Sequence, residues 1–288
     1  MTKINKVTVL GSSGQIGAYL VSHLERAGYD VCSIDIVNDF SEDLRMSGNV
    51  LVEQSISSAD FVFFLAFDVG GSPYLDKYQH KFNFIHNNNL IMSNTFGLLK
   101  RYKVPFVFAS SQMSNMGHSP YGVLKHVGEL YTKSLSGVVV KFWNVYGVEK
   151  DPEKTHVITD FIRKAMHGDS VHMRTDGTEE REFLYAEDCC EALVAIMSNY
   201  DEVKLEQELH VTSFQSSTIL DVAKIVASLA RHNVQFIPSE LKDNVQKNAR
   251  NIASESIKRW WRPKTSLERG IKKVWDAMNL DQQTKPRI

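Results

Sequence analysis

Short apolar runs alternate with stretches of helical periodicity along the first half of the chain. The first run, at residues 7–10, ends in glycines, and apolar residues then recur every three or four positions as far as Gly28. A second run at residues 31–35 completes a strand–helix–strand unit, whose crossover we expect to be right-handed. Further strands are predicted at residues 61–66, 104–109 and 138–142, with helices at residues 78–101 and 121–135. Continuous apolar strands that alternate with helices are typical of a parallel sheet covered on both faces.

Beyond residue 150 the pattern becomes less regular. The expected helices lie at residues 156–167, 186–199, 217–231 and 266–278, and the expected strands at residues 171–174, 181–185 and 210–212. We therefore predict an α/β fold, with a Rossmann-type doubly wound parallel sheet in residues 1–150 and a smaller mixed α/β C-terminal substrate lobe in residues 151–288. Part of residues 181–215 is expected to return to the first domain. Residues 37–58 carry little strand signal, so the third strand of such a sheet is poorly marked.

Composition excludes several classes of partner. The 288 residues include 33 Lys plus Arg and 34 Asp plus Glu, and this near-neutral balance favours neither nucleic acid nor an anionic membrane as partner. No apolar stretch reaches the length of a membrane span. Cys32, Cys189 and Cys190 show no CxxC spacing, and an odd number of cysteines is a poor disulfide framework. We expect a cytoplasmic protein without a metal site.

Three glycines follow the first predicted strand. Gly11, Gly14 and Gly17 stand where a chain must turn sharply, admit a pyrophosphate to its backbone and pack a helix closely on the sheet. The helix that begins near Gln15 and Ile16 would direct its free N–H groups at the anion, so both residues are expected to contact the cofactor.

An acid ends the second predicted strand. Asp35 lies 24 residues after Gly11, where a carboxylate accepts hydrogen bonds from the adenine ribose hydroxyls of a dinucleotide. No Arg or Lys occurs in residues 35–39 to bind a 2′-phosphate, which favours NAD over NADP.

A hydroxyl, a phenol and an ammonium follow in order. The strand at residues 104–109 leads into Ser110 and Ser111, and Tyr121 and Lys125 lie at i and i+4 on one helical face. A lysine cation beside the phenol, aided by the positive nicotinamide, would lower the pKa of Tyr121 and let it remove a hydroxyl proton. Ser111 would hold the same oxygen through a hydrogen bond, so these three residues are the predicted catalytic group.

With these motifs the sequence resembles the extended short-chain dehydrogenase/reductase family, specifically its NAD-dependent nucleotide-sugar epimerases and dehydratases. Besides the glycines and the Tyr/Lys pair, the resemblance rests on Leu65-Ala66 after a strand, Asn88 in the next helix, Lys141-x-x-Asn144-Val-Tyr-Gly147, Arg181-x-Phe-x-Tyr-x-x-Asp188 and Trp261-x-Pro263-x-x-Ser-Leu267-x-x-Gly270. The third of these motifs has Lys141 where the family has Arg.

The resemblance implies further roles. Leu65 and Ala66 would line the NAD site in residues 1–150, and residues 151–288 would bind a nucleotide-diphosphate sugar. Asn144 would contact the phosphate or the sugar, Arg181 would bind the diphosphate, and Arg250 is a looser candidate for a second diphosphate ligand. The family also implies a homodimer, packed through the apolar positions of the helix that carries Tyr121.

The residues after Ser111 distinguish the family's reactions. Gln112 and Met113 supply neither the Asp-Glu pair of the 4,6-dehydratases nor the Cys of the 3,5-epimerases and epimerase-reductases. The remaining chemistry needs only Tyr, Lys, Ser and NAD, so we predict a 4-epimerase first and a 4-dehydrogenase or ketoreductase second. A non-catalytic NAD-binding sensor is a further alternative, because fold alone does not determine function.

One departure from the family lies beside the site. Ser111 and Tyr121 are ten residues apart, whereas the family has a longer stretch there that forms part of the sugar-binding wall. The site is therefore expected to be wider, or filled by another segment such as residues 68–74. The short link also leaves the identity of the hydroxyl open among Ser110, Ser111 and Ser114, and we choose Ser111 because its position in the strand fits the family pattern. His118 in the link is interpreted as a solvent-facing histidine or an extra acid–base group.

Overall fold

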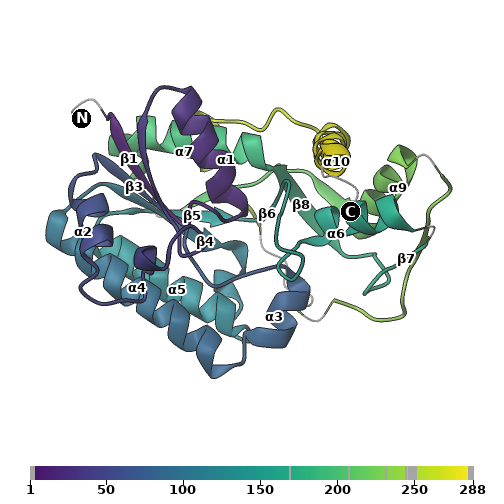
Figure 1. Cartoon of the computed structure of the whole chain (residues 1–288), viewed down its shortest axis with the longest axis horizontal. Coiled ribbons are helices and arrows are strands. Elements are labelled where there is room, and N and C mark those ends of the chain that lie inside the picture. The colour runs from purple at the N-terminus through teal and green to yellow at the C-terminus, as the bar shows by residue number, and fades with distance from the viewer. Residues whose placement is uncertain are drawn as a thin grey trace.

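The computed structural model describes residues 4–168, 170–206, 208–230, 232–243, 245 and 252–284. Its centre is a parallel sheet of six strands in the order β2-β1-β3-β4-β5-β9 (Figure 1). The strands are β1 (Lys6–Leu10), β2 (Asp30–Ile34), β3 (Phe61–Phe64), β4 (Phe106–Ser111), β5 (Val138–Phe142) and β9 (Leu209–Val211). The predicted α/β fold with a Rossmann-type parallel sheet is confirmed, and β9 joins the sheet beside β5 although it comes from the second half of the chain.

Helices cover both faces of this sheet. Helices α1 (Gln15–Arg26) and α7 (Ala186–Ser198) lie on one face, and α2 (Val50–Ser57), α4 (Phe82–Tyr102) and α5 (Pro120–Ser134) on the other (Figure 1). Side chains alternate along the strands, so that Phe61 and Phe63 pack under α1 and α7 while Val62 and Phe64 pack under α4. Both faces of the sheet are therefore buried under helices, as is typical of a parallel sheet.

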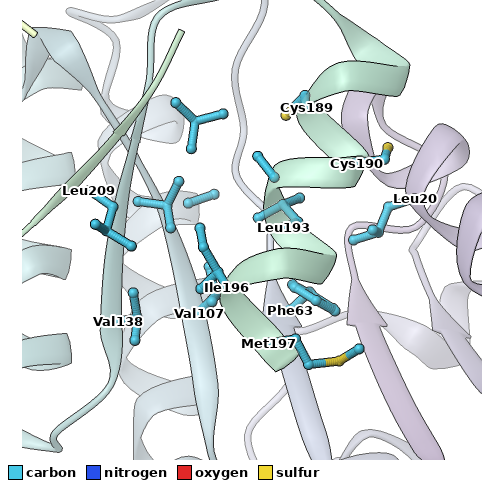
Figure 2. Packing of buried hydrophobic residues seen from close by; sticks show 14 of the residues in the cluster. Leu20, Phe63, Val107, Val138, Cys189, Cys190, Leu193, Ile196, Met197 and Leu209 are labelled. Atoms are coloured by element: carbon cyan, nitrogen blue, oxygen red, sulfur yellow. The ribbon is translucent and has the colours of Figure 1, made fainter. Parts of the chain in front are cut away.

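Helix α7 shows how the first of these faces is filled. Leu193, Ile196 and Met197 project from α7 onto the sheet, where Val107 and Leu209 lie (Figure 2). Cys189 and Cys190 are also buried on this helix and form no disulfide. These two cysteines are core residues.

The structure differs from the prediction between β2 and α4. Residues 37–58, all of them described, form the short 3₁₀ helix η1 (Phe40–Glu42) and α2 and contain no strand, so β2 is an edge strand of the sheet. The Asn49 side chain caps α2 by accepting from the N–H groups of Leu51 and Val52. The helix predicted at residues 78–101 begins later, as α4, because the chain is extended at Lys81, and a separate helix α3 (Ser72–Tyr78) that was not predicted precedes it.

The rest of the second half forms a smaller mixed layer. A three-stranded sheet has the order β10-β8-β6, from β10 (Ser216–Thr218), β8 (Glu180–Tyr185) and β6 (Asn144–Tyr146), and β11 (Gln235–Ile237) pairs with β7 (Ser170–His172). Helices α6 (Val157–His167), α9 (Ile219–Leu229) and α10 (Leu267–Thr284) pack with them around a separate apolar cluster. A four-residue helix α8 (Tyr200–Val203) and the 3₁₀ helices η2 (Gln112–Asn115) and η3 (Ser256–Arg259) complete the fold. No helix in these described residues is long and apolar enough to cross a membrane.

Candidate active site

A cavity of about 860 Å³ opens at the carboxyl ends of the central strands. Ligands of open α/β sheets bind at this edge. The walls include every predicted cofactor and catalytic residue: Gly11, Gly14, Gln15, Ile16, Gly17, Asp35, Leu65, Ala66, Ser111, Tyr121 and Lys125. Of the predicted substrate residues, Asn144 lines the cavity as well, Arg181 is not among the lining residues, and Arg250 lies outside the described part of the chain.

The glycine turn between β1 and α1 has no room for side chains. A Cβ atom at Gly11, where φ is +87°, would lie 2.6 Å from the Ala66 nitrogen, and one at Gly17 would lie 2.0 Å from the Gly11 carbonyl oxygen. The N–H of Gly14 donates to that same oxygen at 3.3 Å, and no side chain caps α1, which begins at Gln15. The result is a cradle of bare backbone at a helix N-terminus, which fits the pyrophosphate of NAD.

Asp35 is held in the same cavity by backbone groups. Its carboxylate accepts from the N–H of Ser13 at 2.9 Å and from the N–H of Val37 at 3.0 Å, and its own N–H donates to Glu42 at 2.7 Å. The carboxylate is therefore fixed beside the glycine turn, where it suits the ribose hydroxyls of NAD.

The segment that replaces the third strand also lines the cavity, which the sequence did not indicate. Arg45 lies there as a cation beyond residues 35–39. Its guanidinium donates to both oxygens of Asp43, at 2.9 and 2.8 Å, and this pairing holds the pKa of Asp43 below its usual value. Because Asp43 neutralises it, Arg45 does not weaken the preference for NAD that Asp35 indicates.

The predicted catalytic side chains come together at the end of β4 and the start of α5. Ser119 caps α5 by accepting from the N–H of Gly122 at 3.2 Å, which places Tyr121 and Lys125 in its first two turns. The exposed fractions of Ser111, Tyr121 and Lys125 are 7%, 8% and 4%. The Ser111 hydroxyl accepts from the N–H of Met113 at 3.1 Å, and its interaction with the Tyr121 phenol acts to lower the pKa of Tyr121.

Burial dominates the electrostatics of this group. It raises the pKa of Tyr121 to about 12, against the smaller effect of the Ser111 hydrogen bond. It lowers the pKa of Lys125 to about 7, opposed by Glu129. The Lys125 ammonium donates to the Ala109 carbonyl at 2.6 Å and lies 3.7 Å from the centre of the Phe67 ring. In the protein without cofactor, desolvation disfavours the charged forms of both groups, so the lowering of the Tyr121 pKa by Lys125 and the nicotinamide stays a prediction for the NAD-bound protein.

The three candidate serines have different environments. The Ser110 hydroxyl donates to Glu129 at 2.5 Å, and Ser114 is buried outside the cavity lining. Ser111 both lines the cavity and contacts Tyr121. The geometry therefore supports Ser111 as the hydroxyl that shares the substrate oxygen with Tyr121.

A buried ionic cluster lies next to the catalytic residues. Lys141, the residue that replaces the family's Arg, is 2% exposed, and its ammonium lies 2.8 Å from a Glu208 oxygen and 3.6 Å from a Glu129 oxygen. Glu129 in turn lies one helical turn after Lys125 on α5. Lys141 is thus a buried partner of two carboxylates, and the change from Arg keeps the charge at this position.

The predicted substrate residues beyond β5 are held by neighbours. The Asn144 amide donates to the Glu182 carbonyl at 3.4 Å. The Arg181 guanidinium donates to the Glu180 carbonyl at 2.7 Å and forms an ion pair with Asp243. A role for Arg181 at the diphosphate stays a prediction, and it requires the Asp243 contact to rearrange or to be shared.

Two other predicted residues lie outside the cavity lining. Asn88 is fully buried, and its amide contacts the backbone of Asp68, so it shapes the wall from outside. His118 is exposed, with its ring 3.4 Å from the Val245 carbonyl. The interpretation of His118 as an extra acid–base group therefore has no geometric support.

Comparison with known proteins agrees with this geometry. Residues 7–211 match the family model described as the NAD dependent epimerase/dehydratase family. The chain is 24% identical to a putative UDP-glucose 4-epimerase of Methanocaldococcus jannaschii, over 96% of this chain and 100% of that one. It is 23% identical to UDP-glucuronic acid decarboxylase 1 of Danio rerio, over 93% of this chain and 71% of that one.

A solved epimerase structure from Methanothermobacter thermautotrophicus superposes with a TM-score of 0.81 at 22% identity, covering 97% of this chain and 94% of that one, which confirms the fold. The family match includes the glycine cradle, Asp35 and the Ser111, Tyr121 and Lys125 group, all of which face one cavity. With its parallel sheet and this NAD-compatible site, the chain belongs to the NAD-dependent epimerase/dehydratase family.

Proposed function

We propose that the protein is a nucleotide-sugar 4-epimerase. The observation that carries the proposal is the buried contact between Ser111 and Tyr121 in the cofactor cavity, with Gln112 and Met113 next to it in place of further acids or a thiol. Such a site provides for the oxidation of a ring hydroxyl and its reversal, but not for removal of water by a neighbouring acid pair. When bound, NAD supplies the hydride acceptor and donor.

The side chains have distinct tasks. Ser111 donates a hydrogen bond to the reacting sugar oxygen, which we assign to C4, and Tyr121 takes the proton of that hydroxyl and later returns it. A phenol with a pKa of about 12 is a poor base at neutral pH, so Tyr121 needs a cation beside it when the reaction starts. Lys125 in its charged form and the positive nicotinamide are the two cations that would lower that pKa. After oxidation the ketone must turn so that hydride returns to its opposite face.

The substrate class is proposed from the family relatives and from the residues around the cavity. A nucleotide-diphosphate sugar would extend from Tyr121 past Asn144, with Arg181 and Arg250 as diphosphate ligands. On this proposal residues 1–150 bind NAD and residues 151–288 bind the nucleotide sugar. The similarity to a putative UDP-glucose 4-epimerase and to a UDP-glucuronic acid decarboxylase supports this class.

We also propose that the enzyme is a homodimer. Helix α5 carries Val123, Leu130 and Tyr131 at 44%, 56% and 44% exposure, an apolar surface beside the active site. Pairing with the same surface of a second copy would bury these side chains. Sedimentation at micromolar concentration tests this, and a monomer would contradict it.

A 4-dehydrogenase or ketoreductase is the second candidate, because one contact favours it. A Glu129 oxygen lies 3.6 Å from Nδ1 of His126, whose side chain is 52% exposed. Glu129 also interacts electrostatically with Lys125, so a carboxylate paired with a solvent-exposed histidine lies near the catalytic lysine. A dehydrogenase must release a proton in each turnover, whereas an epimerase returns it to the sugar.

The experiment begins with mass spectrometry of the nucleotides that co-purify with the protein. Thermal shift against UDP-, GDP-, CDP- and dTDP-sugars then identifies the base. The sugar that binds is incubated with the purified protein without added NAD. We expect a C4 epimer to form over many turnovers. A need for stoichiometric free NAD, together with accumulation of a keto-sugar, would establish the dehydrogenase instead.

A further inference from the structure

The wall of the cavity beside Tyr121 is built by two segments that lie far apart in the sequence. Residues 66–72 and residues 148–151, together with Lys154 and His156, all line it. The N–H of Gly71 donates to the Lys154 carbonyl at 2.9 Å, and a Cβ atom at Gly71 would lie 2.3 Å from the Thr155 oxygen. The two segments are therefore in direct backbone contact. Residues 68–72 belong to the segment that we expect to fill the space beside the short link between Ser111 and Tyr121.

Asp68 has a fixed position in this wall. Its N–H donates to the Asn88 amide oxygen at 2.7 Å, and the Asn88 amide nitrogen donates to the Asp68 carbonyl at 3.1 Å. The preceding residue, Phe67, contacts both catalytic side chains, with its ring centre 5.8 Å from that of Tyr121 and 3.7 Å from the Lys125 nitrogen. Asp68 thus follows directly a side chain that touches the reacting group.

The Asp68 carboxylate is held by donors on two sides. One oxygen accepts from the Tyr74 hydroxyl at 2.6 Å and lies 3.8 Å from the Lys154 ammonium, and the other lies 3.5 Å from the Asn87 amide nitrogen. Burial and this hydrogen bond to Asp68 raise the pKa of Tyr74, so Tyr74 stays a neutral donor. The Asp68 side chain is 21% exposed and lines the cavity, which makes it a carboxylate acceptor presented to a ligand.

We propose that Asp68 is a specificity-determining residue at the sugar end of the cavity, where it accepts hydrogen bonds from hydroxyls of a neutral hexose and disfavours a hexuronate. This inference rests on the proposed nucleotide-sugar function. A carboxylate forms strong hydrogen bonds with neutral hydroxyls, whereas a second carboxylate in the same partly buried space is repelled. Lys154, at 3.8 Å, is the cation paired with Asp68, and Arg45 interacts with Asp68 at longer range, so removal of Asp68 or Lys154 changes the net charge of the wall in a known direction.

The test compares binding of a hexose and the matching hexuronate by the NAD-saturated protein. UDP-glucose is paired with UDP-glucuronic acid, or GDP-mannose with GDP-mannuronic acid, according to the base that the protein prefers. We expect the wild-type protein to bind the hexose at least about tenfold more tightly. Asp68→Asn should weaken hexose binding about tenfold and favour the hexuronate, because Lys154 then lacks its partner. Lys154→Met should widen the preference for the hexose.

Asp76→Asn is the matched control. Asp76 is another acid of the same region, on α3, and it pairs with Arg174 outside the large cavity. Its replacement should leave both dissociation constants unchanged. In turnover assays Asp68→Asn should raise KM for the hexose with little change in kcat, since Asp68 binds the sugar and does not transfer its proton.

The outcomes separate this inference from the function on which it rests. If the wild-type protein binds hexose and hexuronate equally, or Asp68→Asn leaves their ratio unchanged, the role of Asp68 is refuted and the nucleotide-sugar function stands. If the wild-type protein binds no nucleotide sugar of any of the four bases, both proposals fail.

Discussion

Lys125 carries an ammonium group into the protein interior, and this should make the stability of the fold depend on pH. The side chain is 4% exposed, and burial lowers its pKa from 10.5 to about 7. In the unfolded chain a lysine titrates near its ordinary value. Between about pH 7 and pH 10 the unfolded state therefore binds more protons than the folded state, and stability rises with pH. Below pH 7 both states are protonated, and the cost of the buried charge is fully present.

The size of this effect follows from the pKa shift. With about 1.4 kcal/mol for each pKa unit, the Lys125 contribution to the free energy of unfolding should increase by about 3 kcal/mol between pH 6 and pH 9.5. Lys125→Met keeps much of the side-chain volume but cannot titrate. It also leaves the Ala109 carbonyl without its donor, which costs roughly 1–3 kcal/mol at every pH. The difference between wild-type protein and variant therefore contains one pH-dependent part and one constant part.

Urea unfolding followed by tryptophan fluorescence measures both parts. Wild-type protein and Lys125→Met, each free of bound nucleotide, are compared at pH 6, 7, 8 and 9.5, with Lys133→Met on the exposed side of the same helix as control. As the pH falls, we expect the free energy of unfolding of Lys125→Met to rise relative to that of the wild-type protein. For Lys133→Met, the difference from the wild-type protein should not change with pH. A pH-independent difference for Lys125→Met would show that Lys125 titrates as an ordinary lysine, and would refute the account of the site's electrostatics.

Three further variants test the site more directly. Tyr121→Phe should lower turnover in steady-state kinetics by at least about 100-fold, because the group that carries the proton is lost. The affinity for NAD should stay unchanged. Near-normal turnover would contradict the role of Tyr121. Gly17→Ala should weaken NAD binding and lower stability by about 1–3 kcal/mol, since its Cβ would meet the Gly11 carbonyl. Gly97→Ala, whose Cβ meets nothing within 4 Å, is the control in calorimetric unfolding, and equal effects of the two would count against the cradle. Asp35→Ala should weaken NAD binding about tenfold and narrow the preference over NADP in titration calorimetry; an unchanged NAD/NADP ratio would argue against ribose recognition by Asp35.

Local patterns predicted the central sheet and the cofactor turn because their physical causes are local. Strand β5 spans residues 138–142 as expected, since a continuous apolar run between turns has few alternatives in an α/β chain. The glycines after β1 lie within seven residues of one another. In this stretch the chain turns, its backbone packs closely on neighbouring backbone, and a helix begins. The position of Asp35 near the glycine turn could also be predicted from this strand–helix–strand unit, because the neighbouring strands β1 and β2 end side by side.

Short strands were missed because partners elsewhere in the chain create them. Strands β6, β10 and β11 have three residues each and exist through pairing with β8 or β7, which no local pattern shows. The sequence marks no helix at residues 50–57, although Val52 and Ile56 of α2 lie one helical turn apart and face the core. A helix of eight residues has only about two turns, which is too few to show a helical pattern of apolar residues in the sequence.

The chemistry of the site depends on burial, which the sequence does not contain. The Tyr/Lys spacing correctly placed Tyr121 and Lys125 in one cavity, but it gave no sign that burial raises the pKa of Tyr121 in the protein without cofactor. The wall around Asp68 depends on contacts 20 residues apart with Asn88 and across the chain between Gly71 and Lys154. Neither contact has a signature in the spacing of residue types.

Isotope transfer tests the central claim most directly. A nucleotide sugar of the preferred base, labelled with deuterium at C4, is incubated with the purified protein and no added NAD, and the products are followed by NMR. The account predicts that the C4 epimer forms with its deuterium still at C4, because the atom removed in the oxidation returns to the same carbon from the other face. Loss of deuterium from the sugar together with accumulation of a ketone, or recovery of the sugar unchanged, would contradict it.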